Sequence, residues 1–358
     1  MKTRSILFLL LLGVTIGRAQ PPAAQGAVGQ VRRAMPVANE KQRVCEKRAL
    51  DWFQKNQNPD GSWGDSQKGA MTGFSLLVFL AHGETPEARD YGPTVSKAIT
   101  WILENGAKSD GRLNMAAAFN QPSVYEHAIC TYALCEYYTI TRDGRAVALL
   151  KKALGYIVQG QGPGGGWMYS YDRTADDLSV SGWQIQALRS AQLSKLEIPG
   201  VDPAIKKAMK YLEAVKGPKG GYGYRGPQDK YSLTGAAIYC RLLGKAERGE
   251  LRKGMEWLLD ETEKDKPVKY QGDAADLYAW YYHTRACQFF GGAAWLKWNH
   301  WFRDEILGAQ SPDGSWPIPG GRGLGLQNAP GKSGQVYRTA MCMLMLETFY
   351  RCLPTLQD

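Results

Sequence analysis

Two kinds of helical pattern alternate along this chain. Six segments are apolar on almost every side, and an amphipathic segment precedes each of them; the apolar segments are Met71–His82, Val124–Thr141, Asp176–Leu196, Tyr231–Leu243, Ala274–Phe290 and Gln335–Arg351. A helix that is apolar all round must be enclosed by other elements. We therefore predict an all-α fold over residues 41–358. It is a six-pair α/α toroid, a double ring of six inner and six outer helices.

A short turn phrase recurs after the amphipathic segments. It reads QNPDGSW up to Trp63, QGPGGGW up to Trp167, KGPKGGY up to Tyr222 and QSPDGSW up to Trp316. Proline and glycine suit a turn, and the glutamine amide is expected to bond the unpaired carbonyls of the helix end. Trp63 and Trp316 are expected to be buried against their preceding helices. The first and last copies match because a closed ring makes the end units neighbours, whereas an open solenoid would need polar caps at its ends.

The repeated phrases carry a family resemblance. RALDWFQKNQNPDGSW (48–63) and KALGYIVQGQGPGGGW (152–167) resemble the QW repeats of squalene–hopene and oxidosqualene cyclases, and the repeat covers 45–352. The resemblance implies membership of the terpenoid cyclase and protein prenyltransferase toroid superfamily, among prenyltransferase/squalene oxidase repeat proteins. The same toroid occurs in prenyltransferase β subunits and in thioester domains. The chain lacks the Asp-x-Cys motif of the first and the Gly-Cys-Gly-Glu-Gln motif of the second.

The same resemblance implies a site. Triterpene cyclases open an inner helix with Asp-x-Asp-Asp, and here TADDLSV places Asp176 and Asp177 at the last two acids and Thr174 at the first. Asp176 is then the general acid, facing the axis, and Asp177 supports it by turning toward backbone amides. The competing interpretation is that both acids only complement the dipole of a helix start. No metal and no cofactor are expected.

Further polar and aromatic residues gather at or near the starts of the inner helices. In a toroid these starts meet at one end and form a common mouth. The expected cavity-lining residues are Glu126, His127, Trp183, Tyr231, Asp273, Asp276, Tyr337 and Arg338. Carboxyl groups across such a mouth also suit a carbohydrate-processing toroid. For His127 the alternative is a satisfied core histidine beside Glu126, and for Asp276 with His283 it is ordinary helix packing.

The ends of the chain and its charge bear on location and partners. Residues 1–19 read as a signal peptide and residues 20–40 as a flexible leader, so we expect export to the periplasm or outside the cell. The net charge is +10, but basic residues are interleaved with acidic ones, and no nucleic-acid partner or later membrane helix is expected. Candidate partners are a hydrophobic small molecule, bound or converted by a cyclase-like enzyme, and another protein, bound by a non-catalytic scaffold. The seven cysteines include no CxxC pair and are expected to be buried rather than to form a disulfide framework.

Overall fold

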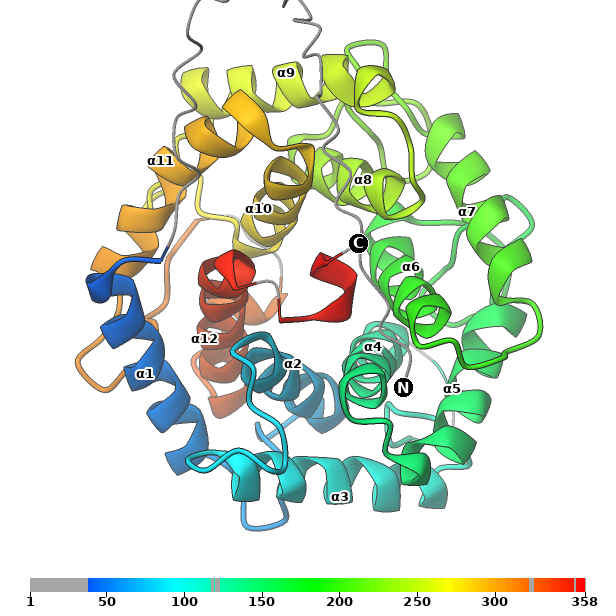
Figure 1. Ribbon diagram of the computed structural model, residues 1–358. Helices are drawn as coiled ribbons and strands as arrows, with labels where there is room; N and C mark the ends of the chain where they lie inside the picture. Colours follow the sequence, from blue (N-terminus) through cyan, green and yellow to red (C-terminus); the bar gives the residue numbers. More distant parts are fainter. Residues whose placement is uncertain (1–37, 117–118, 120–122, 322–324, 351, 358) are drawn as a thin grey trace, which may run out of the picture. The chain divides into compact units, whose positions relative to one another are not determined.

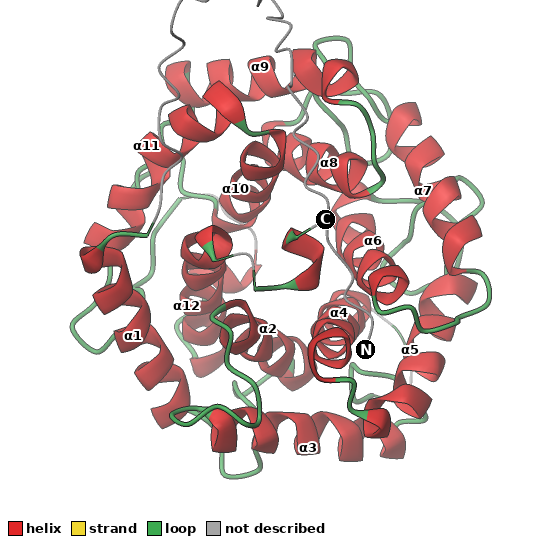
Figure 2. Ribbon diagram, viewed as in Figure 1, coloured by secondary structure: helices red, strands yellow, loops and turns green. Residues whose placement is uncertain are grey.

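Helices dominate the computed structural model, which describes residues 38–116, 119, 123–321, 325–350 and 352–357. These residues lie in one compact unit, 36–358, and among them only isolated β-bridges interrupt the helices and loops (Figures 1 and 2). The outer helices are α1 (Glu40–Lys55), α3 (Gly92–Lys108), α5 (Val147–Gln159), α7 (Val201–Ala214), α9 (Arg248–Lys264) and α11 (Gly292–Gly308). The inner helices are α2 (Lys68–Ala81), α4 (Ser123–Thr141), α6 (Leu178–Leu193), α8 (Tyr231–Leu243), α10 (Leu277–Phe290) and α12 (Lys332–Leu346).

The inner helices form a closed ring. Each packs against the next, and the last, α12, packs against the first, α2 (Figure 1). The outer layer closes at the same place, where α1 contacts both α11 and α12. The predicted six-pair α/α toroid is confirmed, and the open solenoid is excluded.

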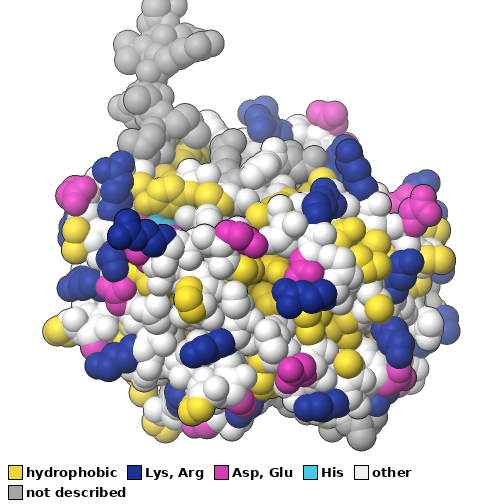
Figure 3. Space-filling model, turned by 60° about the horizontal axis from the view of Figure 1, so that its bottom comes forward, with side chains coloured by type: hydrophobic (Ala, Val, Ile, Leu, Met, Phe, Trp, Pro, Cys, Tyr) yellow, Lys and Arg dark blue, Asp and Glu magenta, His cyan; other side chains and the backbone are white. Residues whose placement is uncertain are grey.

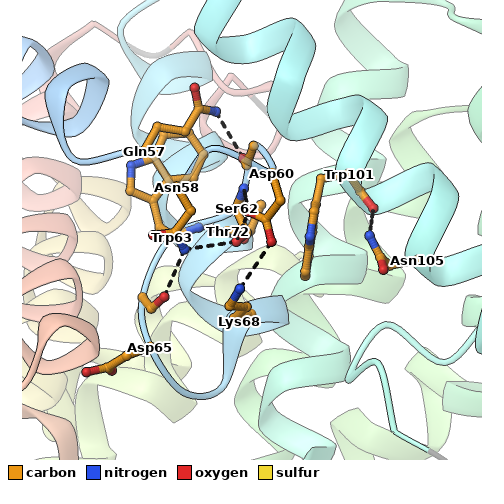
Figure 4. Close-up of polar contacts among 12 residues, drawn as sticks. Gln57, Asn58, Asp60, Ser62, Trp63, Asp65, Lys68, Thr72, Trp101 and Asn105 are labelled. Carbon is orange, nitrogen blue, oxygen red and sulfur yellow. Dashed lines mark hydrogen bonds and ion pairs between the residues drawn. The ribbon is translucent and has the colours of Figure 1, made fainter.

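The corner turns hold the two rings together. Trp63 is fully buried and its indole Nε1 donates to the carbonyl of Phe53 at 2.8 Å. Trp316 is equally buried and donates to Ile306 at 2.8 Å, so both tryptophans pack on their preceding outer helices as predicted. Figure 4 shows the first corner, in which Asp60 also bonds Ser62 and pairs with Lys68.

The corner glutamines make different bonds from those expected. Gln57 donates to the carbonyl of Gly61 in its own turn and to that of Thr94 in the next outer helix, each at 2.9 Å. Gln310 does the same with Gly314 at 2.9 Å and with Cys45 of α1 at 2.8 Å. The glutamine therefore joins each corner to the following repeat instead of capping the preceding helix, and the last corner is joined to the first helix.

A glycine in each corner makes room for that next helix. Gly314 has φ +96°, and a Cβ there would lie 2.2 Å from the carbonyl oxygen of Arg48. Gly61 has φ +92°, and its Cβ would lie 2.5 Å from the oxygen of Lys97. The basic residue at the start of the repeated helix pattern, Arg48 or Lys97, therefore lies against the glycine of the preceding corner. This contact explains why the corner phrase and the basic residue recur together.

The end of the chain turns back into the ring. After α12 the chain forms the short 3₁₀ helices η3 (Glu347–Phe349) and η4 (Pro354–Leu356). The second of these contacts α4 and α6, and Figure 1 shows it inside the circle of inner helices. The predicted continuation of the last inner helix to Arg351 is therefore too long.

Several expectations about the whole chain meet the structure only in part. The predicted signal peptide, 1–19, and most of the leader, 20–40, lie outside the described residues. No helix among the described ranges has the length and apolar character to cross a membrane. All seven cysteines are unpaired and six are buried. On the face drawn in Figure 3, basic side chains are mixed with acidic ones and form no continuous stripe.

Candidate functional site

Asp177 is the central acid at the starts of the inner helices. It caps α6, because its Oδ1 accepts from the backbone nitrogen and the hydroxyl of Ser179 at 2.9 and 2.6 Å. Its Oδ2 lies 3.7 Å from Nε of Arg225 and 3.4 Å from the hydroxyl of Tyr169. Its side chain is 4% exposed, whereas that of Arg225 is 57% exposed. Asp177 is thus a nearly buried carboxylate in an ion pair with a cation that reaches solvent.

Asp176 occupies a different place. Its Oδ1 accepts from the backbone nitrogen of Gly166 at 3.1 Å. A Cβ on Gly162 or Gly164 would come within 2.2 or 2.1 Å of its carboxylate oxygens. Burial raises its pKa, and the amides of Gly166 and Gly164 oppose that shift. The expectation that Asp176 faces the axis is wrong. It precedes the helix cap, and the glycine-rich corner holds its side chain.

Three tyrosines surround the cap of α6. The hydroxyl of Tyr125 on α4 lies 2.8 Å from Oγ of Ser179, and Tyr278 on α10 donates to the carbonyl of Ser179 at 3.1 Å. The ring of Tyr169 lies 5.9 Å from that of Tyr125. Sequence reasoning missed Tyr125 and Tyr169 as site residues. Their positions in the sequence could have indicated them: Tyr125 is adjacent to Glu126, and Tyr169 lies eight residues before Asp177.

Asp276 brings a second carboxyl group to this mouth. It caps α10, with Oδ1 accepting from the backbone nitrogen of Ala279 at 3.0 Å. Burial raises its pKa. Burial raises the pKa of Tyr224, and the nearby carboxyl groups of Asp177 and Asp276 contribute to that rise. Asp276 thus stands at the start of an inner helix, whereas Asp273 is exposed in the preceding loop.

Aromatic rings meet along the axis behind the mouth. Trp183 on α6 stacks on Tyr281 of α10, with centroids 5.4 Å apart and planes 16° from parallel. Phe74 on α2 contacts Trp183 at 5.4 Å and Tyr337 of α12 at 5.8 Å. Trp183 and Tyr337, which are expected from the sequence to line a cavity, are both buried among these rings. The rings of α2, α6, α10 and α12 pack against one another there, so these two residues belong to a packed aromatic core.

Glu126 and His127 serve the fold. Oε1 of Glu126 accepts from the backbone nitrogen of Gly69 at 2.7 Å and so caps α2, whose own cap residue supplies no side-chain bond. Burial raises the pKa of Glu126 to about 7. His127 accepts from the backbone nitrogen of Leu113 at 2.9 Å and lies 3.0 Å from the carbonyl of Ala153, and burial lowers its pKa to about 4. It is a satisfied core histidine.

Three other polar residues of the inner helices also have structural partners. The hydroxyl of Tyr231 lies 2.9 Å from that of Thr262 on α9, between the two rings. Arg338 donates to the carbonyls of Trp316 and Ala329 at 3.3 and 2.7 Å. Nε2 of His283 lies 3.0 Å from the carbonyl oxygen of Tyr231, so this face of α10 makes ordinary helix-packing contacts. The expectation that Tyr231 and Arg338 line the mouth is wrong, because these contacts direct them outward or to a corner.

Metal ligands and surface hollows add nothing to this mouth. Within the described ranges, no three or more histidine, cysteine or acidic side chains are grouped so that they could hold a metal ion. Two hollows of about 280 and 680 Å³ lie beside α5 and at the loop before α7. Neither includes a residue expected from the sequence to belong to the site.

Comparison with known proteins identifies the fold alone. No protein-family model and no curated protein matches the chain. An α-1,6-mannanase, GH76A of Salegentibacter sp. HEL1_6, is 11% identical, with a TM-score of 0.62 over 86% of this chain and 99% of that chain. The type II terpene cyclase MstE from Scytonema is 12% identical, with a TM-score of 0.56 over 88% of this chain and 100% of that chain. The chain shares its α/α-toroid fold with both, as the repeat resemblance implied.

Proposed function

We propose that this protein binds a carbohydrate at the mouth around Asp177 and Asp276, and that it acts there as an exported glycoside-processing toroid. The observation that carries the proposal is the environment of Asp177: a nearly buried carboxylate, paired with Arg225 and bordered by tyrosines. Ionised carboxylates and phenols are strong hydrogen-bonding partners for sugar hydroxyls. Export rests on the signal-like residues 1–19.

The chemistry of the two acids supports glycoside hydrolysis. That reaction needs one carboxyl group that holds a proton and another that is ionised. Burial raises the pKa of Asp276, which suits a proton donor. Asp177, in its ion pair with Arg225, suits the ionised partner. Each acid caps its helix with Oδ1, and Oδ2 of Asp177 accepts from Tyr169 and faces Arg225.

The same observations weigh against cyclisation of an isoprenoid. A cyclase must deliver a proton to an alkene, and a carboxylate in an ion pair accepts hydrogen bonds instead. Asp176, which the cyclase motif implies as the acid, is held by the corner glycines. The axis that would hold a long apolar ligand contains interlocked rings of Phe74, Trp183 and Tyr281. The known mannanase complexes with α-1,6-mannotriose and α-1,6-mannotetrose provide the first ligands to test.

Titration calorimetry with a panel of oligosaccharides that includes these two tests the proposal. Asp177→Asn keeps a good helix cap and removes the charge, so affinity should fall about 10–100-fold through loss of a charged hydrogen bond. Asp276→Asn should abolish hydrolysis of the oligosaccharide, measured by chromatography of the products, while binding persists. The matched control is Asp273→Asn in the exposed loop, which should change neither quantity.

Three outcomes would contradict the proposal. One is a wild-type protein that binds no member of the panel. Another is an equal affinity of wild type and Asp177→Asn for the same sugar. The third is binding of geranylgeranyl dihydroxybenzoate, the substrate seen in the MstE complex, with no sugar bound. That result would restore the isoprenoid hypothesis.

A further inference from the structure

Gln327 holds the backbone on both sides of Asp276. It belongs to the 3₁₀ helix η2 (Gly325–Asn328), in the loop between α11 and α12, and it is 1% exposed. Its Oε1 accepts from the backbone nitrogen of Leu277 at 2.8 Å, and its Nε2 donates to the carbonyl of Ala275 at 2.9 Å. Ala275 precedes Asp276 and Leu277 follows it, so one buried amide group fixes both neighbours of the acid.

The loop that carries Gln327 is bonded on two further sides. Nε2 of Gln327 also donates to the carbonyl of Gly320 at 2.9 Å, within the same loop. Gly321 has φ +70°, and a Cβ there would lie 2.3 Å from the carbonyl oxygen of Ala275. From α12, Arg338 donates to the main-chain carbonyl of Gln327 at 3.2 Å. The start of α10 is therefore joined through this loop to the last inner helix.

The helix start at Asp177 has an equivalent support, made by the backbone. The nitrogen of Leu178 donates to the carbonyl of Tyr224 at 2.9 Å, in the loop before α8. At both sites the residue after the acid donates to the loop before the next inner helix. The first amide groups of a helix have no partner within it, so an outside acceptor restrains the turn that carries the acid. At Asp276 that acceptor is the side chain of Gln327, which a substitution can remove.

We propose that Gln327 is a positioning residue for the reaction, because it holds Asp276 in the orientation in which its carboxyl group meets the substrate. The inference rests on the proposed function, in which Asp276 donates the proton. The side chain of Gln327 bonds backbone groups of its loop and of the start of α10, so its influence passes through Asp276. Displacement of a reacting group by about 1 Å can lower turnover by about 100-fold.

Steady-state kinetics of the full chain tests this role, with α-1,6-mannotetrose or whichever oligosaccharide of the panel the wild type hydrolyses. Gln327→Met keeps the length of the side chain and removes its three bonds. The kcat should fall about 10–100-fold, while KM changes little, because the lost positioning acts on the transition state and not on binding of the sugar.

Gln57→Met is the matched control. Gln57 also donates to two carbonyls, those of Gly61 and Thr94, but it lies in the first corner. This substitution should lower the melting temperature, as Gln327→Met should, and yet leave kcat unchanged. A loss of stability by itself then does not explain a loss of turnover.

Gln327→Asn provides a second variant if Gln327→Met does not fold. It keeps an amide but is one methylene shorter, so it cannot bond Ala275 and Leu277 together, and its kcat should lie below that of wild type. Amide hydrogen exchange, resolved by mass spectrometry, measures the anchoring without any substrate. The amide of Leu277 should exchange about tenfold faster in Gln327→Asn than in wild type.

The outcomes separate this inference from the proposed function. An active wild type with an unchanged kcat in the Gln327 variants would overturn the positioning role alone, as would an equal loss of kcat in Gln57→Met. Unchanged exchange at Leu277 would overturn the anchoring of the helix start. A wild-type protein that hydrolyses no oligosaccharide would overturn the proposed function and, with it, the role of Gln327 in the reaction.

Discussion

Replacing Gly314 by alanine tests how the toroid closes. Gly314 lies in the last corner and has φ +96°, in the left-handed region that residues with a Cβ avoid. The added methyl group would lie 2.2 Å from the carbonyl oxygen and 2.7 Å from the carbonyl carbon of Arg48. Both are backbone atoms of α1, so a side-chain rotation cannot relieve the contact. The first helix of the ring must move away from the last corner.

The expected loss of stability combines two effects. The left-handed backbone costs an alanine about 1–2 kcal/mol, and forced displacement of packed structure costs about 1–3 kcal/mol. Movement of α1 would also lengthen the bond from Gln310 to the carbonyl of Cys45, now 2.8 Å. We expect the free energy of unfolding to fall by about 2–5 kcal/mol. The melting temperature should fall by about 4–10 °C, at roughly 2 °C per kcal/mol for a chain of this size.

Urea denaturation followed by circular dichroism measures this change, with Gly308→Ala as the control. Gly308 is the last residue of α11, and a Cβ there would meet nothing within 4 Å. That substitution should raise stability by about 0.4–1 kcal/mol, because alanine restricts the unfolded chain. If Gly314→Ala were as stable as wild type or as Gly308→Ala, the close approach of α1 to the last corner would be refuted.

Two further predictions concern buried groups. Because the folded pKa of Glu126 is about 7, above its ordinary 4.5, the folded state binds the extra proton in this interval. Stability should therefore fall as pH rises from 4.5 through 7, by up to roughly 3 kcal/mol from this residue. Glu126→Gln should remove that part of the decline in pH-dependent urea titrations, and unchanged pH dependence would contradict the assignment. Separately, alkylation of the unfolded protein without reductant should label all seven cysteines in mass spectrometry, since the structure leaves them unpaired, and a disulfide-linked pair would contradict this.

The sequence by itself determined the architecture. Hydrophobic periodicity is a local property, and it separated enclosed from amphipathic helices without any knowledge of contacts. The repeated corner phrase placed Trp63 and Trp316 against their own helices, and the structure confirms both positions. Its near identity at the two ends of the chain also indicated closure, because a ring makes the first and last repeats neighbours.

Only the tertiary structure decided which polar residues belong to the mouth. Asp176 and Asp177 are adjacent, yet one is held by corner glycines and the other caps α6 beside Arg225. A shift of one residue in the helix start separates these roles, and contacts with the corner set that start. Glu126, His127 and Arg338 looked like site residues, but backbone groups distant in sequence or in other elements satisfy them. A periodic pattern shows that a position faces inward, but not which groups from the other helices meet it there.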